Sequence, residues 1–164
     1  MEQSISKCIT RLEFYQPKYL HLFEEYYLSE EQSRFTAQPI DAIRACENDQ
    51  ERIPILILYE DKIAGFFVLH GWNGAKDYSN NKQALLLRAY SVDSSFQGKG
   101  IAQKSLELLP AFVKEHFPGK NEIILAVNQI NTIAQHVYKK CGFVDEGIRA
   151  MGRQGPMYIL HMKF

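Results

Sequence analysis

The chain has 164 residues, 46% of them hydrophobic, and its 19 Lys and Arg residues are balanced by 19 Asp and Glu residues. This length is enough to bury a core without disulfides or metals, so we expect a single domain over residues 1–164. The absence of a basic excess argues against a nucleic-acid partner. Three cysteines without a Cys-x-x-Cys spacing argue against a disulfide framework and a zinc site.

Hydropathy gives no sign of a membrane partner. No segment approaches the roughly 18 apolar residues of a membrane span, and the residues after Met1 lack the apolar core of a signal peptide. We therefore expect a cytoplasmic location. The five histidines show no His-x-x-x-His spacing, so we expect no metal ion.

The hydrophobic pattern predicts a mixed α/β domain of about seven strands and four helices. Apolar residues at every second position are typical of a strand, and apolar residues three or four apart are typical of a helix. In chain order we expect a strand at 8–14, helices at 18–28 and 40–49, a tight hairpin of strands 53–59 and 63–70, an exposed loop at 71–82, a strand at 84–92, a helix at 100–116, a strand at 122–127, a helix at 131–141, and strands at 143–148 and 157–163.

A glycine-rich run follows the expected strand 84–92 and opens the next helix. It consists of Gln97, Gly98, Lys99, Gly100, Ile101 and Ala102. Glycines let successive N–H groups point into one concavity, and the positive end of the helix dipole adds to their attraction for phosphate. A P-loop does not fit, because Gly-Lys-Ser/Thr is absent, nor does a dinucleotide fingerprint, because Gln103 occupies its third small position. A turn that merely starts a helix is the alternative.

A second motif lies some thirty residues further on. It consists of Asn131, Ala134, Tyr138 and the pair Gly142-Phe143. Together with Gln97, Gly100 and Ala102, this motif resembles the GNAT superfamily of acetyl-CoA-dependent N-acetyltransferases, and the resemblance covers residues from about 85 to 143. It implies a mostly antiparallel sheet whose central strands, 84–92 and 122–127, splay apart to admit coenzyme A. It also implies direct attack of a small-molecule primary amine on acetyl-CoA.

The resemblance assigns a catalytic role to Tyr138, as the general acid beside the thioester sulfur. A phenol with a pKa near 10 is protonated at neutral pH, whereas a thiol leaving group has a pKa near 8.5. The alternative is a core aromatic residue, because Ala134, Val137, Tyr138 and Cys141 fall at helical spacing.

The resemblance also implies a set of cofactor contacts. These come from Tyr90, Val92, Gln97, Gly98, Lys99, Gly100, Ile101, Ala102, Asn131 and Lys140. The backbone of Tyr90 and Val92 would hydrogen-bond the pantetheine, and the Val92 N–H would donate to the oxyanion. Asn131 has a second interpretation as a helix N-cap, and a lysine at the surface is commonly only solvated.

Four glutamates surround the end of the first expected helix: Glu24, Glu25, Glu30 and Glu31. In the resembled family this region lines the acceptor site, and a polycationic acceptor would favour such a lining. A solvated helix face is the alternative. Residues 28–35 followed by Pro39, together with residues 87–93 and 96–100, resemble bacterial diamine and spermine/spermidine acetyltransferases. In a departure from them, Gln154-Gly155-Pro156-Met157 stands where an acidic residue is expected. No residue is marked by sequence as the catalytic base.

Other functions fit the same motifs. One is a non-catalytic acyl-CoA-binding or sensor domain, which retention of Tyr138 disfavours. Another is acetylation of protein N-termini or of aminoglycosides. We expect a monomer or a homodimer.

Overall fold

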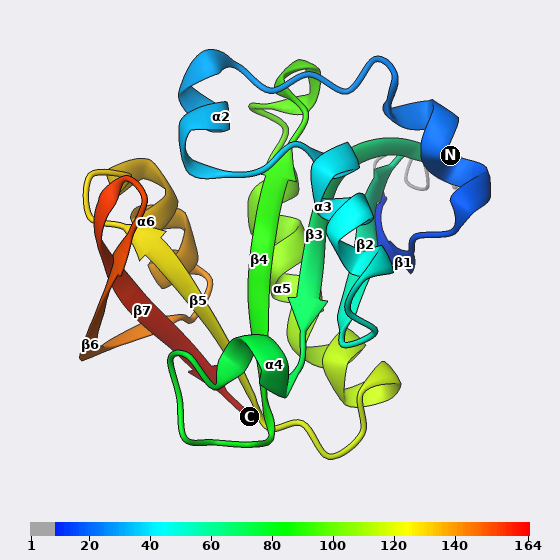
Figure 1. Cartoon of the computed structure of the whole chain (residues 1–164). Coiled ribbons are helices and arrows are strands. Elements are labelled where there is room, and N and C mark those ends of the chain that lie inside the picture. Colours follow the sequence, from blue (N-terminus) through cyan, green and yellow to red (C-terminus); the bar gives the residue numbers. More distant parts are fainter. Residues whose placement is uncertain (1–8) are drawn as a thin grey trace.

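The computed structural model describes residues 9–164 as a seven-stranded sheet with helices on both faces (Figure 1). The strands are β1 (Thr10–Phe14), β2 (Arg52–Tyr59), β3 (Lys62–His70), β4 (Ala84–Val92), β5 (Glu122–Asn128), β6 (Val144–Gly152) and β7 (Gly155–Lys163). Their order across the sheet is β1-β2-β3-β4-β5-β7-β6, and β4 with β5 is the one parallel pair among these strands. The predicted mixed α/β class with a mostly antiparallel sheet is confirmed. Cys8, where the first strand was expected to begin, lies outside the described residues.

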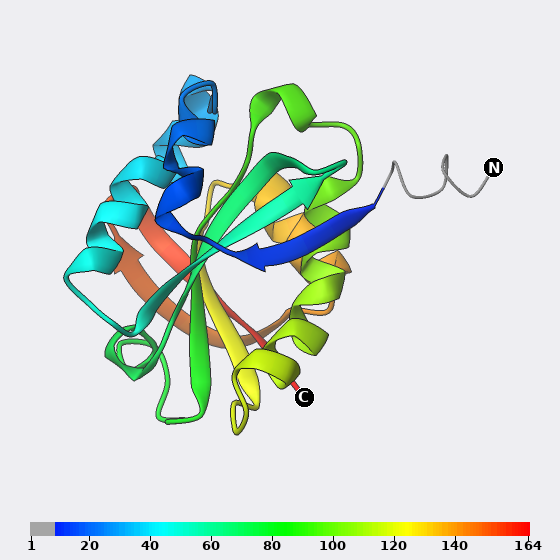
Figure 2. The same cartoon turned by 90° about the vertical axis from the view of Figure 1, so that its right-hand side faces the viewer.

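Helices cover the two faces of the sheet unequally. They are the 3-10 helices η1 (Pro17–Phe23) and η2 (Ser94–Phe96) and the α-helices α2 (Glu30–Phe35), α3 (Pro39–Glu47), α4 (Trp72–Ala75), α5 (Ile101–His116) and α6 (Thr132–Lys140). Figure 2 shows η1, α2 and α3 on one side of the sheet and α5 and α6 on the other. Each side has its own buried cluster. One joins Leu109 of α5 to Ile123 of β5, and the other contains Phe23 of η1 and Ile43 of α3. Within residues 9–164, no helix has both the length and the apolar character needed to cross a bilayer.

The β2–β3 hairpin confirms the sequence prediction. Tyr59 pairs with Lys62, so Glu60 and Asp61 alone form the turn. Both have positive φ, 53° and 66°, which is the geometry of a type I′ turn that matches the twist of antiparallel strands.

The segment between β1 and α3 differs from the expectation of one helix over 18–28. Only the 3-10 helix Pro17–Phe23 forms there, and α2 occupies the region that was expected to be a loop. Helix α2 begins at a capping box: the Ser29 hydroxyl accepts a hydrogen bond from the Gln32 N–H, and the Gln32 side chain accepts one from the Ser29 N–H. The expected 71–82 loop likewise contains α4, and β6 extends past residue 148 to Gly152.

The sheet opens between β4 and β5. The two strands pair only where Ala84, Leu85 and Leu86 lie opposite Glu122, Ile123 and Ile124. Beyond these pairs β4 stays on β3 and β5 stays on β7, and the ribbons of β4 and β5 diverge in Figure 1. A bulge near Ala89, whose φ is +54°, changes the register of β4 against β3. The splay implied by the resemblance is therefore confirmed.

Candidate active site

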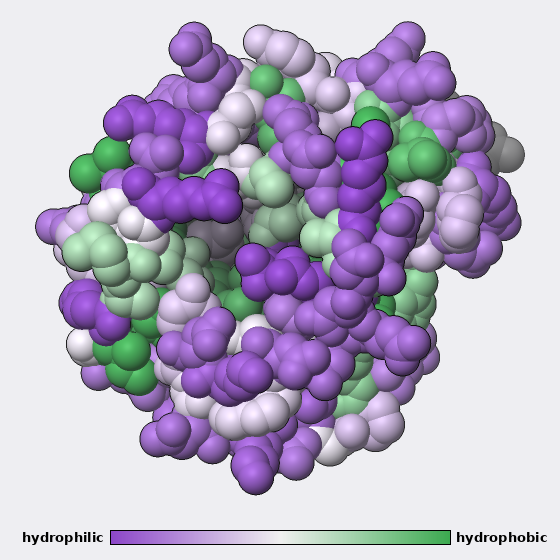
Figure 3. All heavy atoms as spheres, in the orientation of Figure 1, coloured by the Kyte–Doolittle hydropathy of each residue, from purple (hydrophilic) through white to green (hydrophobic). Residues whose placement is uncertain are grey.

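A cleft lies where β4 and β5 diverge. Its volume is about 470 Å³, within the roughly 300–1,000 Å³ of small-molecule sites. Its walls come from β4, β5, α2, the first turn of α5 and one side of α6 as far as Tyr138. Figure 3 shows a hollow on the face of the molecule that is seen in Figure 1.

The glycine-rich run forms the part of this wall that precedes α5. Gly98 and Gly100 have φ values of +80° and +75°, which L side chains rarely adopt. No backbone N–H from Gly98 to Gln103 has a hydrogen-bond partner within residues 9–164, and no side chain caps α5. This unbroken run of free donors at the positive end of a long helix attracts anions. The lining residues are Gln97, Gly98, Gly100, Ile101 and Ala102, whereas Lys99 is exposed and does not line the cleft.

Asn131 caps the start of α6 and also lies in the wall of the cleft. Its side-chain oxygen accepts a hydrogen bond from the Ala134 N–H at 3.3 Å, so the N-cap interpretation is confirmed. A contact of Asn131 with a cofactor stays a prediction.

Tyr138 presents a free hydroxyl to the cleft. Its ring packs against Tyr90 and Phe143, with centroids 6.1 Å and 5.8 Å apart, as the core interpretation expects. The residue nevertheless lines the cleft, and its hydroxyl has no hydrogen-bond partner in the described part of the chain. Burial raises the pKa of Tyr138 above its ordinary value, so the hydroxyl keeps its proton at neutral pH.

The end of β4 supplies Tyr90 and Val92 to the wall. The Tyr90 hydroxyl lies 2.5 Å from Ser105 Oγ and donates to the Ala102 carbonyl at 3.2 Å, which joins β4 to α5. The Val92 carbonyl accepts a hydrogen bond from Gln32 Nε2 at 2.8 Å. The backbone roles predicted for Tyr90 and Val92 stay predictions.

The predicted charged residues are only partly brought together. Of the four glutamates, Glu31 lines the cleft, and Glu24, Glu25 and Glu30 have exposed side chains that do not. Lys140 ends α6 and is exposed outside the lining. Among residues 9–164, no three His, Cys, Asp or Glu side chains are grouped so that they would hold a metal ion.

Sequence reasoning did not single out Gln32 of α2 or Arg88 of β4 as parts of the wall. Besides holding Val92, Gln32 accepts a hydrogen bond from Ser94 Oγ at 2.6 Å, so it fixes α2 against the end of β4. The Ser29-to-Gln32 capping-box pattern was the available signal. For Arg88 the signal was one charged residue in the otherwise uncharged strand Ala84–Val92.

Comparisons with known sequences agree with one family. The acetyltransferase (GNAT) family model matches residues 16–143. The uncharacterized N-acetyltransferase YbbJ of Bacillus subtilis (strain 168) is 43% identical over 162 residues, which cover 98% of each chain. The spermine/spermidine N(1)-acetyltransferase of the same strain is 27% identical over 112 residues, or 66% of this chain and 72% of that protein.

Solved structures share the fold at low sequence identity. Aminoglycoside acetyltransferase AAC(6')-Ib, in complex with coenzyme A and kanamycin, has a TM-score of 0.77 at 16% identity and covers 94% of this chain and 95% of its own. A chimera of spermidine N-acetyltransferase SpeG from Vibrio cholerae and hSSAT has a TM-score of 0.66 at 17% identity, with 94% of each chain covered. Because the family model spans most of the sequence and YbbJ matches nearly all of it, this chain belongs to the GNAT family of acetyltransferases.

Proposed function

We propose that this protein, as a single domain, transfers the acetyl group of acetyl-CoA to a primary amine of a small molecule, which attacks directly. The observation that carries the proposal is the meeting of two unpaired donor sets in one cleft. These are the N–H groups at the start of α5 and the Tyr138 hydroxyl. The first set suits a pyrophosphate and the second suits a leaving thiolate. The coenzyme A complexes of similarly folded proteins support the same donor.

The residues present fit coenzyme A along the length of the cleft. The N–H groups from Gly98 to Gln103 would hold the pyrophosphate, and Lys99 and Lys140 would add positive charge from the exposed rim. The splayed edge of β4 at Tyr90 and Val92, together with Asn131, would receive the pantetheine. Acetyl-CoA supplies an acetyl thioester, which reacts with neutral amines.

Tyr138 would stabilise the charge that develops on the departing sulfur. Its pKa is raised by burial, whereas a thiol has a pKa of about 8.5. The phenol would therefore donate a hydrogen bond to the sulfur, and the proton would stay mainly on the phenol oxygen. The apolar neighbourhood formed with Tyr90 and Phe143 strengthens such a bond, because it is only weakly screened there.

Two measurements test the proposal. Coenzyme A and acetyl-CoA should raise the melting temperature and NAD should not, since a ligand at 100 times its Kd adds about 2.7 kcal/mol of stability. Release of free thiol is then followed with polyamines, aminoglycosides, amino acids and peptide N-termini as acceptors. Protection by NAD alone would overturn the donor assignment. Binding of acetyl-CoA without thiol release from any amine would favour the acyl-CoA-binding or sensor domain.

Polyamines are one specific acceptor class within this proposal, and the acceptor panel tests them against the others. Glu31 lines the cleft and would attract a cationic amine, and a 27% identical relative is a spermine/spermidine N(1)-acetyltransferase. We place the enzyme in the cytoplasm and expect it to act as a monomer or homodimer.

A further inference from the structure

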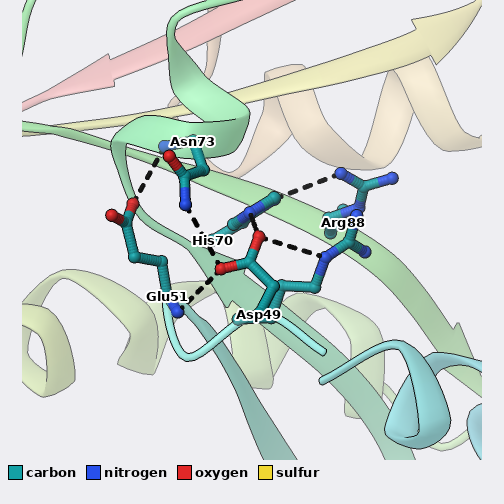
Figure 4. Close-up of polar contacts among 6 residues, drawn as sticks. Asp49, Glu51, His70, Asn73 and Arg88 are labelled. Atoms are coloured by element: carbon teal, nitrogen blue, oxygen red, sulfur yellow. Dashed lines mark hydrogen bonds and ion pairs between the residues drawn. The ribbon is translucent and has the colours of Figure 1, made fainter. Parts of the chain in front are cut away.

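Three side chains from separate elements form a hydrogen-bonded row (Figure 4), and the last of them lines the cleft. Asp49 follows α3, His70 ends β3 and Arg88 lies on β4. His70 Nε2 lies 2.8 Å from Asp49 Oδ2, and Arg88 Nη1 lies 3.2 Å from His70 Nδ1. His70 is 3% exposed, whereas Arg88 is a lining residue of the cleft. The row therefore connects a buried ring to the wall of the site.

The row determines which nitrogen of His70 carries the proton. A guanidinium can only donate, so Nδ1 accepts and Nε2 donates its proton to Asp49. Burial lowers the pKa of His70 and outweighs the opposite effect of its hydrogen bond with Asp49, and the nearby Arg52 and Arg88 charges lower the pKa further, so the ring is neutral near pH 7. The ring is also held tightly, because a Cβ on Gly74 would lie 2.2 Å from its Nδ1. His70 thus orients Arg88 without neutralising it.

Asp49 does not supply the missing counter-charge directly to Arg88. Its carboxylate accepts from a backbone N–H at 3.0 Å and from Asn73 Nδ2 at 3.3 Å, and Arg52 Nε lies 3.7 Å away. These bonds and the one from His70 lower the pKa of Asp49, so it stays charged but already has its partners. Arg88 forms no ion pair with any residue from 9 to 164.

Arg88 lies on the face of β4 opposite α5. On that strand Leu87 packs in the cluster beneath α5, and Tyr90 bonds Ser105 of α5. Ala89 instead packs in the cluster beneath η1 and α3, and Arg88 bonds His70 on the same side. The guanidinium is thus separated by the sheet from the N–H groups that would hold the cofactor phosphates.

We propose that Arg88 binds an anionic oxygen group of the acceptor, a carboxylate or a phosphate, so that the preferred substrate is an amine that also carries a negative charge. This inference rests on the proposed acetyltransferase function. His70 uses one of the five N–H groups of the guanidinium, which leaves a planar fork for two parallel bonds to such a group. Glu31 lies in the wall of the same cleft and would attract the ammonium of the same molecule, whereas Arg88 repels a polycation.

The test compares acceptors that differ only in the anion. The matched pairs are L-lysine with cadaverine, L-phenylalanine with phenethylamine, and phosphoethanolamine with ethanolamine. Each is assayed by thiol release, and kcat/KM is calculated from the concentration of the unprotonated amine. We expect at least one anionic member to have a kcat/KM tenfold or more above its partner, and the pair that responds identifies carboxylate or phosphate. In Arg88→Gln this preference should fall by about 10- to 100-fold with an unchanged Kd for coenzyme A.

The control variant is Arg44→Gln, which alters an exposed arginine of α3 outside the cleft and should change neither quantity. Equal or faster acetylation of every partner that lacks the anionic group, by the wild type, overturns the inference but leaves acetyl transfer standing. A higher Kd for coenzyme A in Arg88→Gln also overturns it, because Arg88 would then serve the donor.

A binding measurement keeps the inference testable if no acceptor releases thiol, an outcome that defeats the proposed function itself. The protein saturated with coenzyme A is titrated calorimetrically with the same pairs. Tighter binding of an anionic member that is lost in Arg88→Gln supports the assignment of Arg88, and equal binding of both members in every pair overturns it.

Discussion

The ring of Tyr138 lies edge-on to the ring of Tyr90, with centroids 6.1 Å apart and planes inclined by 69°. Burial raises the pKa of both phenols. Their hydroxyls differ, because Tyr90 bonds Ser105 and the Ala102 carbonyl, and Tyr138 has no partner among the described residues. The Tyr90 hydroxyl therefore has a structural role, whereas the Tyr138 hydroxyl is free to bond a ligand.

Replacing Tyr138 with Phe should lower kcat by on the order of 10², the low end for an acid catalyst, and leave the Kd for acetyl-CoA within about twofold. A raised pKa extends the protonated form to higher pH, so the loss should be the same from about pH 6 to pH 9. Single-turnover acetylation and equilibrium titration measure the two quantities. Unchanged turnover, with chemistry rate-limiting, would leave Tyr138 with a packing role alone.

Tyr90→Phe is the comparison for stability. It removes a hydroxyl that already has partners, so we expect the free energy of unfolding in urea to fall by about 1 kcal/mol. Tyr138→Phe removes an unpaired hydroxyl and should cost less. The reverse order of stability would contradict the hydrogen-bond assignment at this pair.

Gly100→Asp should weaken coenzyme A binding by at least about tenfold. The new carboxylate would stand beside the free N–H groups and repel a phosphate, in addition to the strain of a side chain at φ +75°. Gly147→Asp is the matched control, because Gly147 has φ +93°, open space around it and a position outside the cleft. Calorimetric titration of both variants checks this, and normal affinity in a folded Gly100→Asp protein would remove the loop from the cofactor site.

Locally determined elements were predictable from the sequence. Strand β4 was expected at 84–92 and forms there, and the hairpin turn at Glu60 and Asp61 follows from two apolar runs with a short polar break. The glycine-rich run was also recognisable, because positive φ and helix initiation are properties of neighbouring residues.

The acceptor side of the cleft was not predictable in the same way. Gln32 reaches its place through bonds to Val92 and Ser94, some sixty residues along the chain. The row from Asp49 to Arg88 needs three elements to meet. Glu30 and Glu31 are adjacent and alike in sequence, and only the packing of α2 decides that Glu31 lines the cleft. Such choices depend on tertiary contacts that periodicity does not contain.

Glu31→Lys should raise KM for a cationic acceptor several-fold while sparing the Kd for acetyl-CoA, because it reverses the charge at the cleft wall. Glu30→Lys is the control: both residues lie in the first turn of α2, so each reversal loses the same favourable helix-dipole interaction of about 0.3–1 kcal/mol. Initial-rate kinetics at two salt concentrations measure the effect, which salt should screen. Equal changes in both variants would indicate a solvated helix face.

His70 should make the protein less stable as the solution becomes mildly acidic. Its folded-state pKa is lowered by burial, so the unfolded chain binds a proton below about pH 6.5 that the folded chain refuses. The stabilising contribution is present above that pH and is lost as the pH falls through the unfolded value toward the folded one. Urea unfolding at pH 7.5, 6.5 and 5.5 should show a shallower loss in His70→Gln, and equal slopes would contradict the assignment.

The two halves of the sheet meet along β4 and β5 through a short seam that begins at Ala84 opposite Glu122 and ends at Leu86 opposite Ile124. Beyond the seam, the edges of both strands that face the cleft have no strand to bond. A donor molecule lying there would hydrogen-bond these free strand edges, as a further strand would, as well as being a reactant. Its binding energy would reinforce the middle of the molecule, and backbone amides of residues 87–92 and 125–128 would exchange with solvent more slowly while it is bound. Each catalytic cycle would therefore close and reopen the sheet at its centre.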